Sequence, residues 1–307
     1  MDSSSGALCG DSPWARSRVS DYHNEEEDGM KELGLLIKIT DRDSIETMLN
    51  RVAEFGFSNC QVSTYVPELL TRETAETIKA ICARKKIEIT MMWVGWPGRC
   101  EWNFVGGPDT VGIVPLKYRA ERVAIIKRGS DFAKMLGVGL VASHAGFIPE
   151  NMSDPLYPGV VEVLRELALH CANNGQTLCF ETGQETPVTL LRTLEDVGTG
   201  NLGVNLDPAN LIMYGKGNPV DALKVIGRYV KGIHIKDGKY PTDGKELGVE
   251  VPLGQGDVDF PKFFAGLEAL GYNGAYTLEI ELDRRVKEET PKEAIEAATA
   301  YLRSVLG

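Results

Sequence analysis

The sequence predicts a single α/β domain of the (β/α)8, or TIM-barrel, class. Short apolar runs alternate with amphipathic segments from residue 31 onward, and eight such pairs can be counted. Strict alternation of strands and helices indicates a parallel sheet, and eight units suit a closed barrel. A doubly wound open sheet is the alternative, but it would require a glycine-rich phosphate turn after the first strand, where residues 40–43 contain no glycine.

The predicted strands are short apolar runs, as expected for a parallel sheet that is covered on both faces. In chain order they span residues 34–39, 59–65, 87–94, 139–144, 177–181, 202–207, 230–235 and 275–281. Because parallel strands all end at the same edge of a sheet, polar residues at the ends of these runs are expected to lie close together.

The predicted helices follow the strands, and their apolar residues recur at a helical period. They span residues 44–55, 71–85, 116–136, 160–172, 187–197, 219–229, 260–270 and 291–306. Asp43 or Ser44 is the predicted N-cap of the first helix. The third helix is expected to be broken or softened near Gly129, since glycine is unfavourable inside helices.

Two segments stand apart from this alternation. Residues 1–30 are rich in Ser, Gly, Asp and Glu and lack the apolar core of a signal peptide, so we expect a disordered tail before a barrel domain at 31–307. Residues 95–115 form a long loop rich in Gly, Pro and Trp. Loops of this length are usually functional or disordered, and the aromatic content favours a functional one.

The charge and composition of the chain argue against some classes of binding partner. The formal net charge of -11 and the pI near 5.0 disfavour nucleic acid as a ligand. No apolar run approaches the roughly 18 residues of a membrane span. The six cysteines are scattered without a C-x-x-C pair, which is typical of free thiols in a reducing compartment. We therefore expect a cytoplasmic protein that acts on a small molecule.

Four consecutive predicted strands carry side chains that commonly bind metal ions. The fifth and eighth carry Glu181 and Glu279. The sixth ends on Asp207, and the seventh carries His234. Any one of them could be a helix-capping carboxylate or a core histidine, but four in register favour a shared site. Carboxylates with one imidazole suit a single divalent ion such as Mn, Mg, Co or Zn.

Such a site suggests proton-transfer chemistry. Glu181 and Glu279 lie on strands far enough apart to flank a substrate, so we predict that they are the catalytic acid and base beside a metal-held carbonyl, through an enediolate. His144, at the end of the fourth strand, and Lys236, which alternation places beside His234, are predicted to bind substrate. A packing histidine and an ion-paired lysine are the alternatives.

Aromatic side chains near the predicted rim could wall a sugar pocket, because ring faces stack on sugar C–H surfaces. Trp93 and Trp102 are the predicted substrate contacts among these residues. The wider set is Trp93, Trp96, Trp102, Phe104 and Phe147. Packing of the loop over the barrel mouth is the alternative explanation.

These motifs resemble the xylose isomerase-like TIM-barrel superfamily, and within it the sugar phosphate isomerase/epimerase family. The similar segments are residues 181–185, 205–210, 234–237, 278–281 and the 254–260 element, GQGDVDF. The resemblance implies that Glu181, Asp207, His234 and Glu279 bind one ion, with Mn expected, and that the two glutamates are also the acid and base. It also implies a homo-oligomer or pairing with another subunit.

Departures from the family pattern leave the reaction open. Ketose 3-epimerases have a histidine where this chain has Asn210, which we include among the substrate-binding residues, and their later Glu and Arg are Pro187 and Tyr240 here. Lys236 and Asp237 resemble the inosose dehydratase branch. We predict a sugar isomerase or epimerase; the alternatives are a lyase eliminating from a keto-sugar, keto-inositol or 3-oxo-(C-)glycoside, and a non-catalytic sugar-binding subunit.

Overall fold

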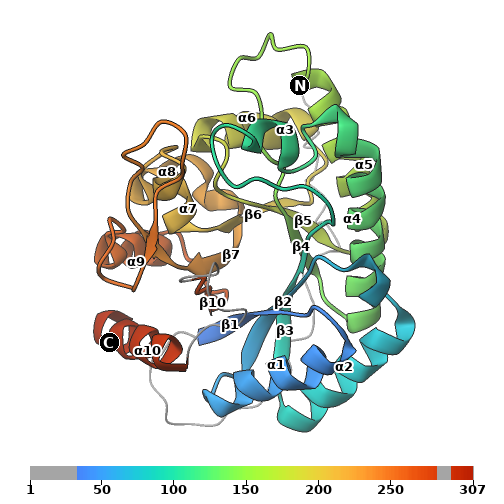
Figure 1. The fold of residues 1–307 in the computed structure, drawn as a ribbon, viewed down its shortest axis with the longest axis vertical. Coiled ribbons are helices and arrows are strands. Elements are labelled where there is room, and N and C mark those ends of the chain that lie inside the picture. Colours follow the sequence, from blue (N-terminus) through green and yellow to red (C-terminus); the bar gives the residue numbers. More distant parts are fainter. Residues whose placement is uncertain (1–32, 282–291, 307) are drawn as a thin grey trace, which may run out of the picture. The chain divides into compact units, whose positions relative to one another are not determined.

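The computed structural model describes residues 33–281 and 292–306, in which eight parallel strands close into a barrel (Figure 1). Around the ring the order is β1-β10-β7-β6-β5-β4-β3-β2. The strands are β1 (Leu33–Lys38), β2 (Asn59–Thr64), β3 (Glu88–Val94), β4 (Leu140–Ser143), β5 (Thr177–Glu181), β6 (Leu202–Leu206), β7 (Val230–Ile235) and β10 (Tyr276–Leu278). The predicted single (β/α)8 barrel is confirmed.

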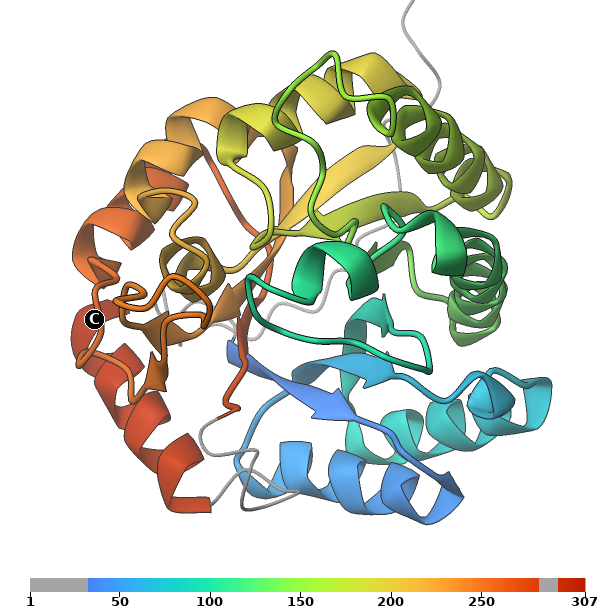
Figure 2. The ribbon, with the colours of Figure 1, turned by 45° about the horizontal axis from the view of Figure 1, so that its top comes forward.

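Helices surround the strands on the outside of the ring (Figure 2). The outer helices are α1 (Arg42–Glu54), α2 (Arg72–Lys85), α4 (Leu116–Leu136), α5 (Tyr157–Asn173), α6 (Pro187–Val197), α8 (Pro219–Ile226), α9 (Phe260–Ala269) and α10 (Lys292–Leu306). Each matches a predicted helix to within a few residues. Short 3-10 turns at η1 (Pro67–Leu69) and η2 (Gly227–Tyr229) join neighbouring elements.

Three small elements lie in the loops that follow the strands. They are α3 (Gly107–Thr110), α7 (Pro208–Met213) and the two-stranded antiparallel sheet of β8 (Asp237–Gly238) and β9 (Glu250–Val251). None was predicted, because each is too short to show a period. Asp207 followed by Pro208 was nevertheless a local signal for α7, since Asp is a good N-cap and Pro suits the first helical position.

The predicted cap of α1 was wrong by a few residues. Asp41 is the N-cap, and its carboxylate accepts a hydrogen bond from the Ser44 backbone N–H at 2.7 Å. Ser44 Oγ in turn accepts from the Asp41 N–H at 3.1 Å. The two residues therefore form a reciprocal capping box in which Ser44 is the third helical residue rather than the cap.

The interior of the barrel holds both polar and apolar side chains. A small buried cluster inside the ring contains Met91, Trp93, Ala142 and Cys179. The larger apolar core lies between the strands and the outer helices. The polar side chains of the predicted site are buried as well, at the carboxyl ends of the strands.

The structure bears on the predictions about the N-terminal tail, the cysteines and membrane spans to different extents. Residues 1–30, predicted to be disordered, lie outside the described residues. The cysteines at 60, 82, 100, 171 and 179 are free, as predicted. Among the described helices, none combines the length and apolar character needed to cross a membrane.

The predicted break near Gly129 is also wrong, because α4 runs unbroken through this residue. A Cβ at position 129 would lie 2.4 Å from Val94 Cγ2, so the glycine is there for close packing of α4 on β3. We predict that Gly129→Ala lowers the free energy of unfolding by about 1–3 kcal/mol through overpacking. In an open helical position the same change would raise it by up to ~1 kcal/mol.

Urea denaturation of the two proteins measures this difference. Glu121→Ala, at an exposed position on the same helix, is the control and should change stability by less than about 0.5 kcal/mol. A Gly129→Ala protein as stable as the wild type would show that the close approach of Val94 has no energetic weight.

Candidate metal centre

Four side chains from adjacent parts of the ring meet at the rim of the barrel. Glu181 ends β5, Asp207 follows β6, His234 lies in β7 and Glu279 follows β10. One ligand atom from each lies within 4.8 Å of the others, and all four side chains are buried. The order β10-β7-β6-β5 makes these strands neighbours, so closure of the barrel brings together residues almost 100 positions apart in the chain.

Asp207 is oriented by the start of α7. Its Oδ1 accepts a hydrogen bond from the Asn210 N–H at 2.9 Å, so one carboxylate oxygen caps the helix. Its backbone is held by Thr182, whose Oγ1 donates to the Asp207 carbonyl and accepts from its N–H, both at 2.9 Å. Oδ2 therefore remains directed toward the cluster.

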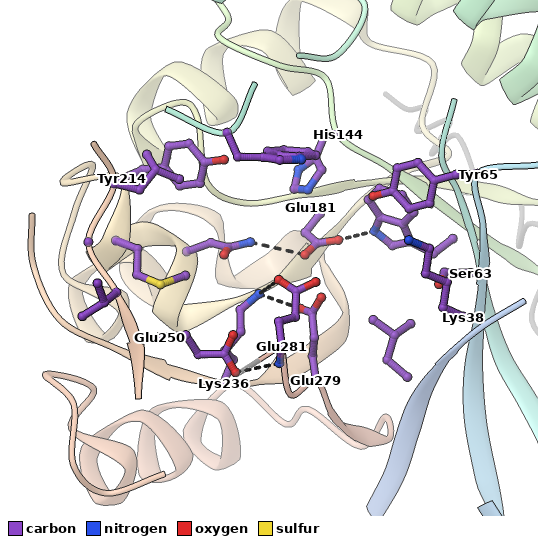
Figure 3. Close-up of a pocket in the computed structure, with 18 of the residues that line it drawn as sticks. Lys38, Ser63, Tyr65, His144, Glu181, Tyr214, Lys236, Glu250, Glu279 and Glu281 are labelled. Carbon is purple, nitrogen blue, oxygen red and sulfur yellow. Dashed lines mark hydrogen bonds and ion pairs between the residues drawn. The ribbon is translucent and has the colours of Figure 1, made fainter. Parts of the chain in front are cut away.

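Lys236 is a fifth buried charge at this cluster (Figure 3). Its Nζ lies 2.9 Å from both Asp207 Oδ2 and Glu279 Oε2, and 3.6 Å from Glu281 Oε2. Burial alone would lower the pKa of Lys236, but the surrounding carboxylates outweigh it and raise the pKa well above its ordinary value. The ion-paired alternative for this lysine therefore holds, and the pairing takes place inside the site.

The carboxyl groups respond to the same balance of burial and charge. Burial acts to raise the pKa of Glu279, but Lys236 and His234 hold it well below its ordinary value. Glu181 is similar: burial opposes ionisation, yet the neighbouring histidines leave its pKa lowered. For Asp207, burial prevails over Lys236 and raises the pKa to about 7.

His234 is fixed by contacts on both ring nitrogens. Nδ1 lies 3.1 Å from Glu181 Oε1 and 2.9 Å from Glu279 Oε2, so it faces the cluster. Nε2 lies 2.9 Å from Gln61 Oε1, and the Gln61 amide donates through Nε2 to Asn205 Oδ1 at 3.3 Å. An amide oxygen opposite Nε2 favours the proton on Nε2, which leaves the Nδ1 lone pair for a metal ion.

This donor set fits a divalent cation. Three carboxylates and one imidazole supply hard oxygen donors and one nitrogen donor, as a Mn, Mg, Co or Zn site would require. Their atoms are close enough to share one ion. Like charges this near one another inside a protein are costly unless an opposite charge compensates them.

A cavity of about 1050 Å³ opens directly onto the cluster. Its wall includes Glu181, Glu279 and Lys236 together with the predicted substrate contacts His144, Trp93, Trp102 and Asn210. Loop residues 246–250 form another part of the wall. The structure therefore places every predicted substrate-binding residue at this cavity.

Two of these residues also touch Glu181. Trp93 Nε1 donates a hydrogen bond to Glu181 Oε2, and Asn210 Nδ2 donates to Glu181 Oε1 at 3.3 Å. His144 lies between the rings of Trp93 and Trp102, with both centroids 5.2 Å from its own. Burial lowers the pKa of His144, which favours a neutral imidazole.

Not all the aromatic residues singled out in the sequence lie at the cavity. Trp96 is buried instead beneath the Arg122 guanidinium, 4.8 Å from its ring. Phe147 packs edge-on against Tyr214. For these two rings the loop-packing alternative is correct.

Asp237 organises the wall that follows β7. Its carboxylate accepts backbone hydrogen bonds from Gly254, Gly256 and Val258 at 2.9, 2.8 and 3.2 Å. A Cβ at Gly256 would lie 1.8 Å from Asp237 Oδ1, so only glycine lets the backbone approach. The GQGDVDF element identified in the sequence is thus a loop wrapped around one carboxylate.

Gln61 and Glu250 were not singled out in the sequence. Gln61 lies in the second strand, NCQVST, and carried no motif, although polar side chains in a strand buried on both faces were a usable signal. Glu250 lies in a loop of no clear period, and only the fold brings it to the cavity.

The chain is thus a closed parallel barrel with a buried Glu–Asp–His–Glu cluster at the carboxyl ends of its strands. This cluster could hold a metal ion. The chain belongs to the xylose isomerase-like TIM barrel family, whose model matches residues 49–305.

Individual relatives span nearly the whole chain. A xylose isomerase domain protein from Planctomyces limnophilus is 36% identical, with 89% of this chain and 97% of that chain covered and a TM-score of 0.81. Inosose dehydratase from Geobacillus thermodenitrificans is 23% identical over 312 residues, covering 91% of this chain and 94% of that protein. The 3-keto-D-glucoside 4-epimerase from E. coli shares the fold at 18% identity, with 90% and 100% covered and a TM-score of 0.65.

The contact between Gln61 and His234 can be tested through metal affinity. We predict that Gln61→Leu weakens Mn binding by about 10–100-fold, because the Nε2 proton loses its acceptor and the imidazole is no longer held in one tautomer. Gln61→Glu retains an acceptor oxygen and should bind Mn ~10-fold more tightly than Gln61→Leu. Isothermal titration calorimetry with Mn measures both, with Asp207→Asn as a ligand-loss control.

Nitrogen NMR of labelled histidine gives a second measurement, which is simple because the chain has four histidines. Wild type saturated with Mg should show His234 protonated at Nε2 and not at Nδ1. Equal Mn affinity in wild type and Gln61→Leu would contradict the role of Gln61, and absence of Mn, Mg, Co and Zn binding by wild type would contradict the metal site.

Proposed function

We propose that the protein is a divalent-metal-dependent isomerase or epimerase of an unphosphorylated sugar or sugar derivative. The observation that carries the proposal is the placement of Glu181 and Glu279 at one buried cluster, on strands separated around the ring by β6 and β7. Two carboxylates approaching one cavity from separate strands can serve the two faces or the two neighbouring carbons of a bound sugar.

Glu181, Asp207, His234 and Glu279 would hold the ion, which when bound would polarise a substrate carbonyl. Glu181 removes the proton from the adjacent carbon, giving an enediolate, and Glu279 returns a proton to the opposite face or to the neighbouring carbon. The Trp93 and Asn210 hydrogen bonds hold the Glu181 carboxylate in one orientation. Lys236 keeps Glu279 ionised in the resting site, and its ammonium group, 2.9 Å away, supplies the proton that Glu279 returns to carbon. Solvent then takes the proton from Glu181 and reprotonates Lys236.

A lyase is the second candidate. Lys236 is held within 2.9 Å of two cluster carboxylates, and the inosose dehydratase relative aligns over almost the entire chain. A lyase would share the first proton removal and differ only in losing a group from the next carbon. A non-catalytic sugar-binding subunit has less support, because binding alone does not require these buried charges.

The charge of the cavity wall favours a substrate without a phosphate. Five glutamates and two lysines line the cavity, and no arginine does so within the described part of the chain. Lys236 is ion-paired in the cluster, and Lys38 Nζ lies 4.7 Å from the Tyr65 ring centroid. A phosphate dianion would therefore face an acidic wall.

The cytoplasmic location of the protein, its assembly into a homo-oligomer and its pairing with another subunit stay predictions.

Replacing either glutamate tests the proton-transfer roles. We predict that Glu181→Gln and Glu279→Gln each reduce turnover at least ~100-fold, the size usual for loss of a general acid or base. NMR in D2O, with a panel of ketoses and a 3-oxo-glucoside, identifies the substrate and follows exchange at the carbon next to the carbonyl. Glu150→Gln, at an exposed position that does not line the cavity, is the control. Full activity of either variant would contradict the proposed proton transfer by these two glutamates.

Phosphorylated and free forms of the same sugars test the substrate class. We predict that the free sugar is turned over with a kcat/KM at least ~10-fold above that of its phosphate ester, because the acidic wall repels the ester. The gap should shrink as ionic strength rises. A preference for the ester would overturn this part of the proposal.

A further inference from the structure

Glu250 is a carboxyl group at the cavity that the proposed proton transfers do not use. It lines the cavity beside Lys236, Glu279 and Glu281, and Figure 3 shows its carboxyl group next to Lys236. Its Oε1 accepts a hydrogen bond from the Glu281 N–H at 2.8 Å. Its Oε2 has no hydrogen-bond partner among the described residues and is thus available to a ligand.

Both strand ends that carry cluster residues hold Glu250 in place. Its backbone pairs with Gly238, two residues beyond Lys236, in the β8–β9 sheet. Its side chain is bonded to the backbone of Glu281, two residues beyond Glu279. The loop that follows is fixed by Asp237, through the hydrogen bonds from positions 254, 256 and 258. A side chain fixed at both ends is pre-organised to meet a bound substrate.

The environment of Glu250 favours its protonated form. Burial raises the pKa of Glu250 to about 8, with Glu281 and Glu279 acting in the same direction and Lys236 opposing them. The carbonyl oxygen of a protonated carboxyl is its better acceptor, so the hydrogen bond from the Glu281 N–H to Oε1 favours the proton on Oε2. That oxygen is the one available to a ligand.

We propose that Glu250 is a catalytic general acid, donating a proton to a leaving oxygen on the carbon next to the one that loses its proton. This inference rests on the proposed proton removal beside the carbonyl. In a lyase reaction, Glu250 would be the third catalytic carboxyl group, besides Glu181 and Glu279. The C–H bond breaks to a basic glutamate, and its electron pair forms the C=C bond. The C–O bond breaks toward oxygen, which takes the Glu250 proton, so an alcohol leaves and an unsaturated ketone remains.

Glycosides with different leaving groups test this role. In a 3-oxo-glucoside the C2 proton is next to the carbonyl, and the aglycone oxygen on C1 is the leaving group. Methyl 3-oxo-glucoside expels a poor leaving group that needs a proton, whereas p-nitrophenyl 3-oxo-glucoside expels a stable anion that does not. A general acid should therefore matter for the first compound and not for the second.

We expect Glu250→Gln to slow methanol release at least ~100-fold while p-nitrophenol release and C2 deuterium exchange change by less than ~3-fold. The glutamine keeps an oxygen for the Glu281 N–H, so the wall should remain folded. Glu250→Asp should recover part of the methanol release. Glu162→Gln, at an exposed glutamate of α5 that does not line the cavity, is the control and should leave all three rates unchanged.

A readout independent of turnover is the infrared difference spectrum between wild type and Glu250→Gln at neutral pH. It should contain the carbonyl band of one protonated carboxyl, lost as the pH rises through about 8.

The outcomes separate this inference from the proposed function. Equal slowing of both leaving groups would make Glu250 a structural residue, and C2 exchange by wild type without release of either aglycone would overturn the inference alone. Absence of exchange with both glycosides and every ketose of the panel would overturn the proposed function, and the inference with it.

Discussion

The compensation of buried negative charge is the constraint on which the rest of this structure depends. Three carboxylates share one small volume at the barrel rim, and each opposes the ionisation of the others. Lys236 lies among them, and His234 adds a second positive charge when no ion is bound. A divalent ion bound through the neutral imidazole would replace that second charge. Removing one member of such a group leaves the other charges uncompensated, so the cluster is a single unit rather than four separate ligands.

The barrel and the cluster were largely predictable from the sequence. Alternating apolar and amphipathic segments gave the correct order of the strands and outer helices, because a parallel sheet covered on both faces leaves a clear pattern. The rim position of Glu181, Asp207, His234 and Glu279 followed from the parallel direction of their strands. Their convergence to within 4.8 Å then requires only that neighbouring strands close into a ring.

What could not be predicted depends on contacts between segments distant in the chain. Gln61 meets His234 across the inside of the barrel, 173 positions away. Gly129 was mistaken for a helix breaker, since the sequence does not show that Val94 lies against it. The small elements α7 and β8–β9 have no periodicity to detect. In each case the deciding interaction is tertiary and overrides local preference.

The hydrogen bonds around Asp237 have a consequence for how new specificities can arise. They fix residues 254–258. Pairing of β8 with β9 fixes residues 237–238 and 250–251, so the segment between these two strands, 239–249, is anchored at both ends. Lengthening an anchored surface loop costs little in closure entropy. Insertions or deletions in this segment would therefore change one wall of the cavity while the Glu–Asp–His–Glu cluster stays in place.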